Sequence, residues 1–163
     1  MAYDAFLDIE GVTSEATREG FEGKIEMIAF DLGATNPSTI GIGGGGGQGK
    51  VSVTPFSFTK RTDKSSPVLY QACCTGRHFP KATVTLHKAG GESAVDYLVY
   101  RFSDVFIESV RWAGRSGDNN DTPLEEVQFT YGRAEIIYTP QKIDGSKDSP
   151  VVGAWDQKKV KAA

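Results

Sequence analysis

The stretch ATVTLHKAGGESAVDYLVYRF, residues 82–102, decides the fold class of this chain. Apolar and polar residues alternate on both sides of a Gly-Gly pair, and a period of two is the pattern of a strand with one buried face. Gly90 and Gly91 supply the backbone freedom that a tight turn needs. The stretch therefore predicts an antiparallel hairpin, whose second strand continues through DVFIESVRWAG, residues 104–114.

The same period recurs on either side of this hairpin, in YDAFLDIE (3–10), GKIEMIAFDLG (23–33), KVSVTPFSFTK (50–60) and EEVQFTYGRAEIIYTP (125–140). Residues 23–33 are apolar on both faces, which predicts one strand that is covered on both sides. The apolar phase shifts by one residue at Pro55 and again at Gly132, which predicts a bulge or kink at each point.

One segment, DKSSPVLYQACCTG (63–76), breaks the alternation. Ser66 is a suitable N-cap, Pro67 suits the first helical position, and Gly76 suits the position after the last turn. Leu69, Ala72 and Cys73 would share one face. We expect a single short helix at about 66–75.

These elements predict one all-β domain over residues 1–163, either a small barrel or two packed antiparallel sheets, with one helix on the side. Two long irregular segments remain, at 33–50 and 113–123. The 163 residues are enough for one core, and no repeat or domain boundary is visible.

The composition argues against several classes of function. A net charge of −3 disfavours nucleic acid as the main partner, because duplex binding depends on Lys and Arg neutralising phosphates. No apolar run is long enough to span a membrane, and the acidic start MAYDAFLDIEG does not match a secretory signal. With two adjacent cysteines we expect folding in a reducing cytoplasm without a disulfide framework.

The run GIGGGGGQGK, residues 41–50, fits seven positions of the phosphate-binding loop pattern from Gly44 to Lys50. Val51 stands where that pattern needs a hydroxyl, and a strand, not a helix, is expected to follow. We interpret the run as a flexible surface loop that becomes ordered against another molecule, and we expect no nucleotide cofactor.

The sequence patterns for a metal site or a catalytic site are as weak as the pattern for a phosphate-binding loop. Cys73, Cys74, His78 and His87 lack the paired spacing of a structural zinc site, so no metal site is predicted. A calcium loop starting at Asp118 fails at Pro123 and Phe129, where it needs Gly and Glu. The pairs Glu125/Glu126 and Asp118/Asp121 are interpreted as solvated groups of strand edges and turns. No nucleophile elbow is present, and we expect no catalytic residues.

Six stretches in collinear order resemble the haemolysin co-regulated protein family, the inner-tube proteins of the bacterial type VI secretion system. They are MAYDAFLDIEGV, GKIEMIAFDLGA, GKVSVTPFSFTKRTDKSSPVLYQACCTGRHFPKATVTLHKAGG, YLVYRFSDVFIESV, GDNNDTPLEEVQFTYGRAEIIYTPQKIDGS and GAWDQKK. The most specific parts are FTKRTDKSSPVL, the KAGG hairpin and IIYTPQKIDGS with the later GAWD. The resemblance covers the chain from end to end.

The resemblance implies a structural function. Members of this family form hexameric rings that stack into a hollow tube, which a contracting sheath expels and a spike trimer caps. Effector proteins are carried inside the lumen, where the ring also protects them. The family implies no enzyme activity, cofactor or membrane insertion. It also implies synthesis in the bacterial cytoplasm and export by the secretion system without a signal peptide.

The family's long loop after the second strand contributes to ring stacking, and residues 33–50 match it here. A head-to-tail surface of this kind propagates instead of closing. The resemblance therefore makes the following residues candidates for the stacking loop: Thr35, Asn36, Pro37, Ser38, Thr39, Ile40, Gln48 and Lys50. The polyglycine run is unusual for the family in its composition.

The alternative is a stand-alone β-sandwich that binds a ligand or carbohydrate. Trp112, Tyr131 and Trp155 could form an aromatic sugar platform.

Overall fold

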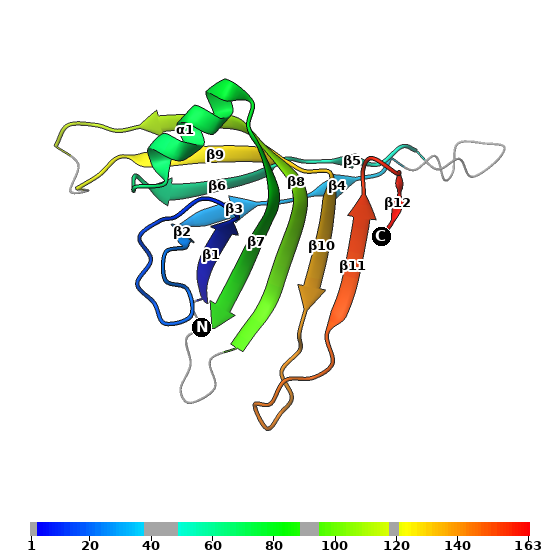
Figure 1. Cartoon of the computed structure of the whole chain (residues 1–163). Helices are drawn as coiled ribbons and strands as arrows, with labels where there is room; N and C mark the ends of the chain where they lie inside the picture. Colours follow the sequence, from blue (N-terminus) through cyan, green and yellow to red (C-terminus); the bar gives the residue numbers. More distant parts are fainter. Residues whose placement is uncertain (1–2, 38–48, 89–94, 118–120) are drawn as a thin grey trace.

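The computed structural model describes residues 3–37, 49–88, 95–117 and 121–163. Its elements, labelled in Figure 1, are β1 (Tyr3–Ile9), β2 (Ile25–Met27), β3 (Ala29–Asp31), β4 (Ala34–Thr35), β5 (Ser52–Val53), β6 (Phe56–Arg61), α1 (Ser66–Thr75), β7 (His78–Lys88), β8 (Val95–Ala113), β9 (Leu124–Thr130), β10 (Arg133–Tyr138), β11 (Val151–Asp156) and β12 (Lys161–Ala162). Over these ranges, no helix has both the length and the apolar character to cross a membrane.

The strands form two layers that share the long strand β8 (Figure 1). One layer has the order β12-β11-β10-β8-β7-β1-β2, and the other continues from the second half of β8 through β9 and β6 to β3. All pairings are antiparallel. The predicted β7–β8 hairpin is confirmed, while its Gly90-Gly91 turn lies outside the described residues.

β8 serves both layers because it bends at Asp104. This residue has a φ of 54°, in the left-handed region that non-glycine residues rarely adopt. β10 pairs with β8 before the bend and β9 pairs with it after the bend, on the same edge. The backbone N–H of Gly132, between β9 and β10, donates to the carbonyl oxygens of Ser103 (2.9 Å) and Asp104 (3.2 Å). The predicted bulge at Gly132 is therefore a break between two strands.

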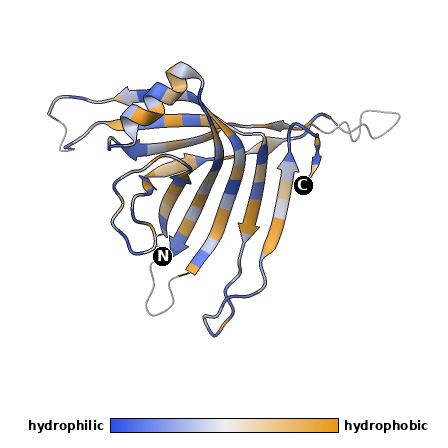
Figure 2. Cartoon of the chain, in the orientation of Figure 1, coloured by the Kyte–Doolittle hydropathy of each residue, from blue (hydrophilic) through white to orange (hydrophobic). Residues whose placement is uncertain are grey.

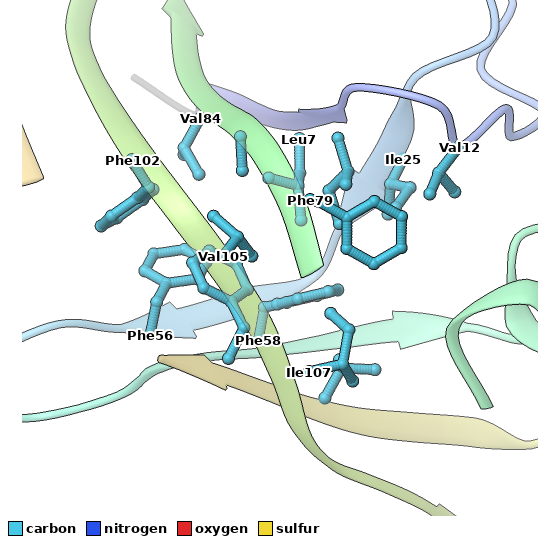
Figure 3. Close-up of a cluster of buried hydrophobic side chains, with 14 of the residues drawn as sticks. Leu7, Val12, Ile25, Phe56, Phe58, Phe79, Val84, Phe102, Val105 and Ile107 are labelled. Carbon is cyan, nitrogen blue, oxygen red and sulfur yellow. The ribbon is translucent and has the colours of Figure 1, made fainter. Parts of the chain in front are cut away.

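The core lies between the two layers and is rich in phenylalanine (Figure 3). Phe56 of β6 is fully buried, and its ring centroid lies 5.2 Å from that of Phe102 and 5.1 Å from that of Phe129. Leu7 and Val84 close the core from β1 and β7 and are also fully buried. Burying each such side chain stabilises the fold by about 1.5–3 kcal/mol, which makes this cluster the main source of stability.

The prediction of one strand at residues 23–33 is wrong. The chain leaves the first layer after β2, and its next residues pair with β6 in the second layer as β3. Ile28 lies at the crossing, where its N–H donates to the carbonyl oxygen of Thr59 (2.8 Å) and its side chain is 55% exposed. The two apolar phases of this stretch therefore belong to two short strands in different layers. Pro55, similarly, separates β5 from β6.

The helix forms where the sequence predicts it, over Ser66–Thr75, with Leu69 and Ala72 buried and Cys73 half-buried. The N-cap position falls on Ser65, one residue before the predicted Ser66. Gly76 ends the helix at a φ of 71°, and its N–H donates to the carbonyl oxygen of Ala72. Glycine meets this left-handed requirement without a Cβ penalty.

The predicted fold class is confirmed: the described chain is mostly β, in two packed antiparallel sheets with one short helix. The sheet does not close into a barrel. The predicted loop at 33–50 begins with β4, which pairs with β5 as a separate two-stranded ribbon.

Candidate functional site

The core-facing side of β10 and β11 continues beyond the core and lacks a cover within the described residues. Ala134 pairs with the buried Phe102, which places Ala134, Ile136 and Tyr138 on the core-facing side. Ile136 is nevertheless 42% exposed and Tyr138 48% exposed. We define the β10–β11 face as the residues of this side: Ala134, Ile136, Tyr138, Val151, Gly153 and Trp155.

The β10–β11 face is bordered by an open sheet edge. β12 pairs with β11 only at Trp155 and Asp156, and over the described ranges no strand pairs with its free edge at Val151 or Val152. Both valines are more than half exposed, and Figure 2 shows hydrophobic colour at this end of β11. Edge strands of soluble proteins usually carry charges, prolines or bulges that block pairing. Apart from Pro150 just before it, β11 has no such protection from Val151 to Trp155.

A hollow lies where the ribbon of β4 and β5 approaches the β10–β11 face. It has a volume of about 330 Å³ and no charged residue in its lining. The residues that line it are Leu32, Gly33, Ala34, Val53, Tyr100, Tyr131, Ala134, Ile136, Gly153, Ala154 and Trp155. Its size falls in the range of sites that hold apolar groups.

Hydrogen bonds hold the base of the ribbon against the sheet. The N–H of Gly33 donates to Thr54 Oγ1 (2.8 Å), and the N–H of Thr54 donates to the carbonyl oxygen of Gly33 (2.8 Å). The hydroxyl of Tyr131 donates to the carbonyl oxygen of Thr54 (3.0 Å), and burial raises the pKa of this hydroxyl above its usual value of 10.0. One wall of the hollow is therefore fixed by Tyr131.

Three further tyrosines lie together beside the β10–β11 face. The rings of Tyr3 and Tyr97 meet edge to face with centroids 6.3 Å apart, and Lys88 Nζ lies 4.5 Å from the Tyr97 centroid. Burial raises the pKa of Tyr97 and of Tyr100, with smaller contributions from neighbouring tyrosines, which include Tyr138 for Tyr97. The exposed apolar area is thus extended by aromatic side chains, which are enriched at protein interfaces.

The described part of the predicted stacking loop forms one arm. Thr35 pairs with Ser52, and the carbonyl oxygen of Pro37 accepts the N–H of Gly49 (3.2 Å). Thr35, Asn36, Pro37 and Lys50 are exposed and lie at the end of β4 or just beyond the paired residues of β4 and β5. The other candidates, Ser38, Thr39, Ile40 and Gln48, lie outside the described residues.

The polyglycine run has one glycine whose role is visible. A Cβ on Gly49 would collide with the carbonyl oxygen and ring of Pro37, so only glycine lets the two sides of the arm come this close. After Lys50 the chain continues as strand β5, which excludes the helix that a phosphate-binding loop requires.

The remaining candidates of the sequence are dispersed. Cys74 is exposed on α1, while His87 is nearly buried with Nδ1 2.6 Å from Asp96 Oδ1. In the described part of the chain, no three His, Cys, Asp or Glu side chains gather as metal ligands. The aromatic platform does not form either: Tyr131 and Trp155 line the hollow, but the ring of Trp112 lies tilted beside that of Tyr70 and lines another pocket.

Sequence reasoning missed the β10–β11 face as a site. The alternation of Ala134, Ile136 and Tyr138 did indicate one apolar face. It could not indicate that this face would remain uncovered, because the cover depends on where β4, β5 and β6 end. Sequence reasoning also misplaced Glu125, whose side chain was interpreted as solvated and is fully buried.

Comparison with known proteins agrees with the fold and with the resemblance. Residues 6–138 match the family model described as type VI secretion system effector, Hcp. The chain is 40% identical to protein hcp1 of Pseudomonas aeruginosa over 157 residues, which is 96% of each chain.

Solved structures give the same result. A structure described as a type six secretion system protein aligns with a TM-score of 0.92 at 26% identity, over 99% of this chain and 100% of the other. Hcp1 from Salmonella typhimurium aligns with a TM-score of 0.79 at 27% identity over the same shares. The Hcp family consists of secreted, structural tube proteins of the type VI secretion system and not of enzymes. The chain belongs to the Hcp family of type VI secretion system proteins.

Proposed function

We propose that this chain is the repeating subunit of a type VI secretion tube. Six copies form a ring, rings stack into a hollow tube, and the tube carries or stabilises effector proteins in its lumen. Residues 1–163 act as one tube domain. The protein is made in the bacterial cytoplasm and is exported by the type VI system, and its other partners are the sheath proteins and the spike trimer.

The observation that carries this proposal is the uncovered β10–β11 face beside the open edge of β11. A monomer that stayed alone in water would expose this apolar area permanently, and large exposed apolar patches usually mark interfaces. In the proposed ring this face contacts a different surface of the next copy, which is a heterologous contact. Heterologous contacts generate rings when the rotation closes.

The arm supports the stacking of rings. Thr35, Asn36, Pro37 and Lys50 project from the sheet on a narrow ribbon whose base is held by Gly33 and Thr54. We propose that these residues, together with Ser38, Thr39, Ile40 and Gln48, contact the next ring.

The test is negative-stain imaging and light scattering of the purified protein over a range of concentrations. Six-fold rings with an open centre support the proposal, and a monomer at every concentration counts against it. Val152→Lys places a charge on the open edge and should raise the concentration needed for half-assembly by about tenfold or more. Val160→Lys is the matched control, because Val160 is equally exposed (59% against 54%) but lies outside β11.

A ligand-binding module is the second candidate, and the hollow beside Trp155 is the observation that favours it. It predicts a monomer that retains a small apolar molecule or a sugar. Native mass spectrometry of the same sample distinguishes the two, because it reports both the number of copies and any bound ligand.

A further inference from the structure

The loop between β10 and β11 presents one apolar side chain that its own chain does not cover. Ile143 lies in this loop and is fully exposed, with a relative accessibility of 110%. The loop projects from the end of the two strands in Figure 1. An aliphatic side chain with no packing partner at all gains nothing from folding, so this position calls for another explanation.

The turn that carries Ile143 is held in shape by hydrogen bonds. The N–H of Gly145 donates to the carbonyl oxygen of Lys142 (2.9 Å), which closes a β-turn with Ile143 and Asp144 at its centre. The N–H of Lys142 donates to the carbonyl oxygen of Ser146 (2.8 Å). Ile143 is thus presented on a preorganised turn.

The same turn is reinforced by side chains. Asp144 Oδ1 accepts the hydroxyl of Ser146 (2.6 Å) and its N–H (2.9 Å), and these bonds lower the pKa of Asp144. The side-chain amide of Gln141 donates to the carbonyl oxygen of Gly145 (2.9 Å). Because the turn is already ordered, a contact made by Ile143 costs little conformational entropy.

The hollow at the other end of β10 and β11 has the complementary chemistry. Its lining is uncharged, it is open to solvent, and at about 330 Å³ it has room for an isoleucine side chain. Gly153 forms part of its floor, and a Cβ on Gly153 would meet no atom within 4 Å. An apolar side chain that entered here would be removed from water on several sides.

Ile143 cannot reach the hollow of its own chain. Tyr138 and Val151 adjoin the loop, whereas Ile136 and Gly153 form the near side of the hollow, two residues of extended strand or roughly 7 Å further along. The loop that carries Ile143 projects from the end of β10 and β11 opposite to the β4–β5 ribbon, which forms the other wall of the hollow (Figure 1). The two features can meet only between different molecules.

We propose that Ile143 of one copy inserts into the hollow of a second copy. The inference rests on the proposed self-assembly and names a contact that drives it. The contact is head to tail, because it joins the loop end of β10 and β11 on one copy to the opposite end of these strands on the next. Repetition of such a contact either closes a ring or extends a stack.

Assembly of the wild type and of two exposed-site variants tests the contact by sedimentation velocity and negative-stain imaging. Ile143→Ser removes the inserted side chain, and Gly153→Leu fills the hollow. Each should raise the concentration for half-assembly roughly ten- to hundredfold. The double variant should be no worse than either single variant, because both changes remove one contact. Ile28→Ser is the control for loss of an exposed isoleucine, and it should leave assembly unchanged.

A cross-link identifies the contact directly. One chain carries Ile143→Cys and a second carries Gly153→Cys, with Cys73 and Cys74 replaced by serine in both. On mixing and oxidation with oxidised glutathione, a disulfide between the two chains is expected, and neither chain alone should form a covalent dimer.

The outcomes separate this inference from the proposed function. A wild type that stays monomeric overturns both. If the wild type assembles and the variants assemble equally well, the Ile143 contact alone is overturned. The same holds if the wild type assembles but no mixed disulfide forms. A small molecule retained in the hollow by assembled wild-type protein, seen by native mass spectrometry, also overturns it.

Discussion

Lys60 Nζ lies 2.8 Å from Glu125 Oε1, and both side chains are fully buried between β6 and β9. The two residues are direct cross-strand partners. Lys60 also donates to Asp63 Oδ1 (2.9 Å) and to Ser66 Oγ (2.8 Å). One ammonium group therefore joins two strands of the second layer to the loop and first turn of α1.

This cluster explains why the segment FTKRTDKSSPVL is polar at positions that face the core. Asp63 accepts the hydroxyls of Ser14 (2.6 Å) and Ser65 (2.5 Å) as well as the ammonium of Lys60. The cluster thus also fixes the segment after β1 that carries Ser14. Neither carboxylate oxygen of Glu125 has a hydrogen-bond partner in the described structure, so the glutamate depends on the charge of Lys60 for its compensation.

Replacing Lys60 with methionine should destabilise the fold by about 3–5 kcal/mol, because it leaves a buried carboxylate without its counter-charge. Urea denaturation at fixed protein concentration measures the loss. Lys64→Met is the control, since the side chain of Lys64 is exposed and the change should stay within about 0.5 kcal/mol. The pair Lys60→Met with Glu125→Leu should recover most of the loss. A Lys60→Met variant as stable as the wild type would contradict this account.

Asp63 should make stability fall in acid. Burial alone would raise its pKa, but the hydrogen bonds from Ser14, Ser65 and Lys60 and the charge of Lys60 lower the pKa below its ordinary value of 3.8. A lowered folded-state pKa means that the unfolded chain binds the proton more tightly. The contribution is therefore complete above the ordinary pKa and is lost as pH falls through the lowered one.

The measurement is the free energy of unfolding in urea from about pH 5 to pH 2. Asp63→Asn should flatten the decline over this range, and Ser14→Ala should reduce it in part because it removes one donor. Asp148→Asn serves as the control, because Asp148 is exposed and distant from the cluster in sequence. An equal decline in Asp63→Asn and the wild type would assign the acid sensitivity to other carboxylates.

The sequence allowed the helix and most strands to be predicted, but not which of their faces other elements would bury. Pro67 and Gly76 act within their own turn, so the helix bounds were predicted correctly and the N-cap was wrong by one residue. Lys60 is in phase with Phe56 and Phe58, but the local sequence does not reveal that β9 supplies a buried partner for it, Glu125. The fully buried Glu125 was misread for the same reason.

The hollow and the β10–β11 face were beyond sequence reasoning because they depend on long-range geometry. Residues of β4 and β5 meet residues of β10 and β11 about a hundred positions later in the chain. A pattern of period two shows that Ile136 belongs to an apolar face. Whether a second layer extends far enough to cover that face depends on where β4, β5 and β6 end, which the local pattern of β10 does not show.

Gly76→Ala should destabilise the protein by about 1–2 kcal/mol, because alanine in the left-handed region brings its Cβ close to the backbone. No other atom causes this loss, since a Cβ at position 76 would lie 3.7 Å from Phe106, an ordinary contact. Gly153→Ala is the matched control: its φ is not positive and its surroundings are open. That variant should be neutral or slightly more stable, through the smaller entropy of its unfolded chain. Thermal unfolding of both variants at equal concentration decides the comparison.

Gly49→Ala should shorten tubes while leaving the fold intact. The added Cβ collides with the carbonyl oxygen of Pro37, so the two sides of the arm must separate beyond the Thr35–Ser52 pair. The arm is exposed and contributes little to the core, so the unfolding transition should change by less than about 0.5 kcal/mol. Gly33→Ala is the matched control on the same ribbon, because its Cβ would only touch Thr54 at 3.7 Å. Tube length in negative-stain images, at concentrations where the wild type stacks, is the measurement. If Gly49→Ala stacks like Gly33→Ala, then the shape of the arm does not matter for stacking, and the proposed role of Thr35, Asn36, Pro37 and Lys50 is wrong.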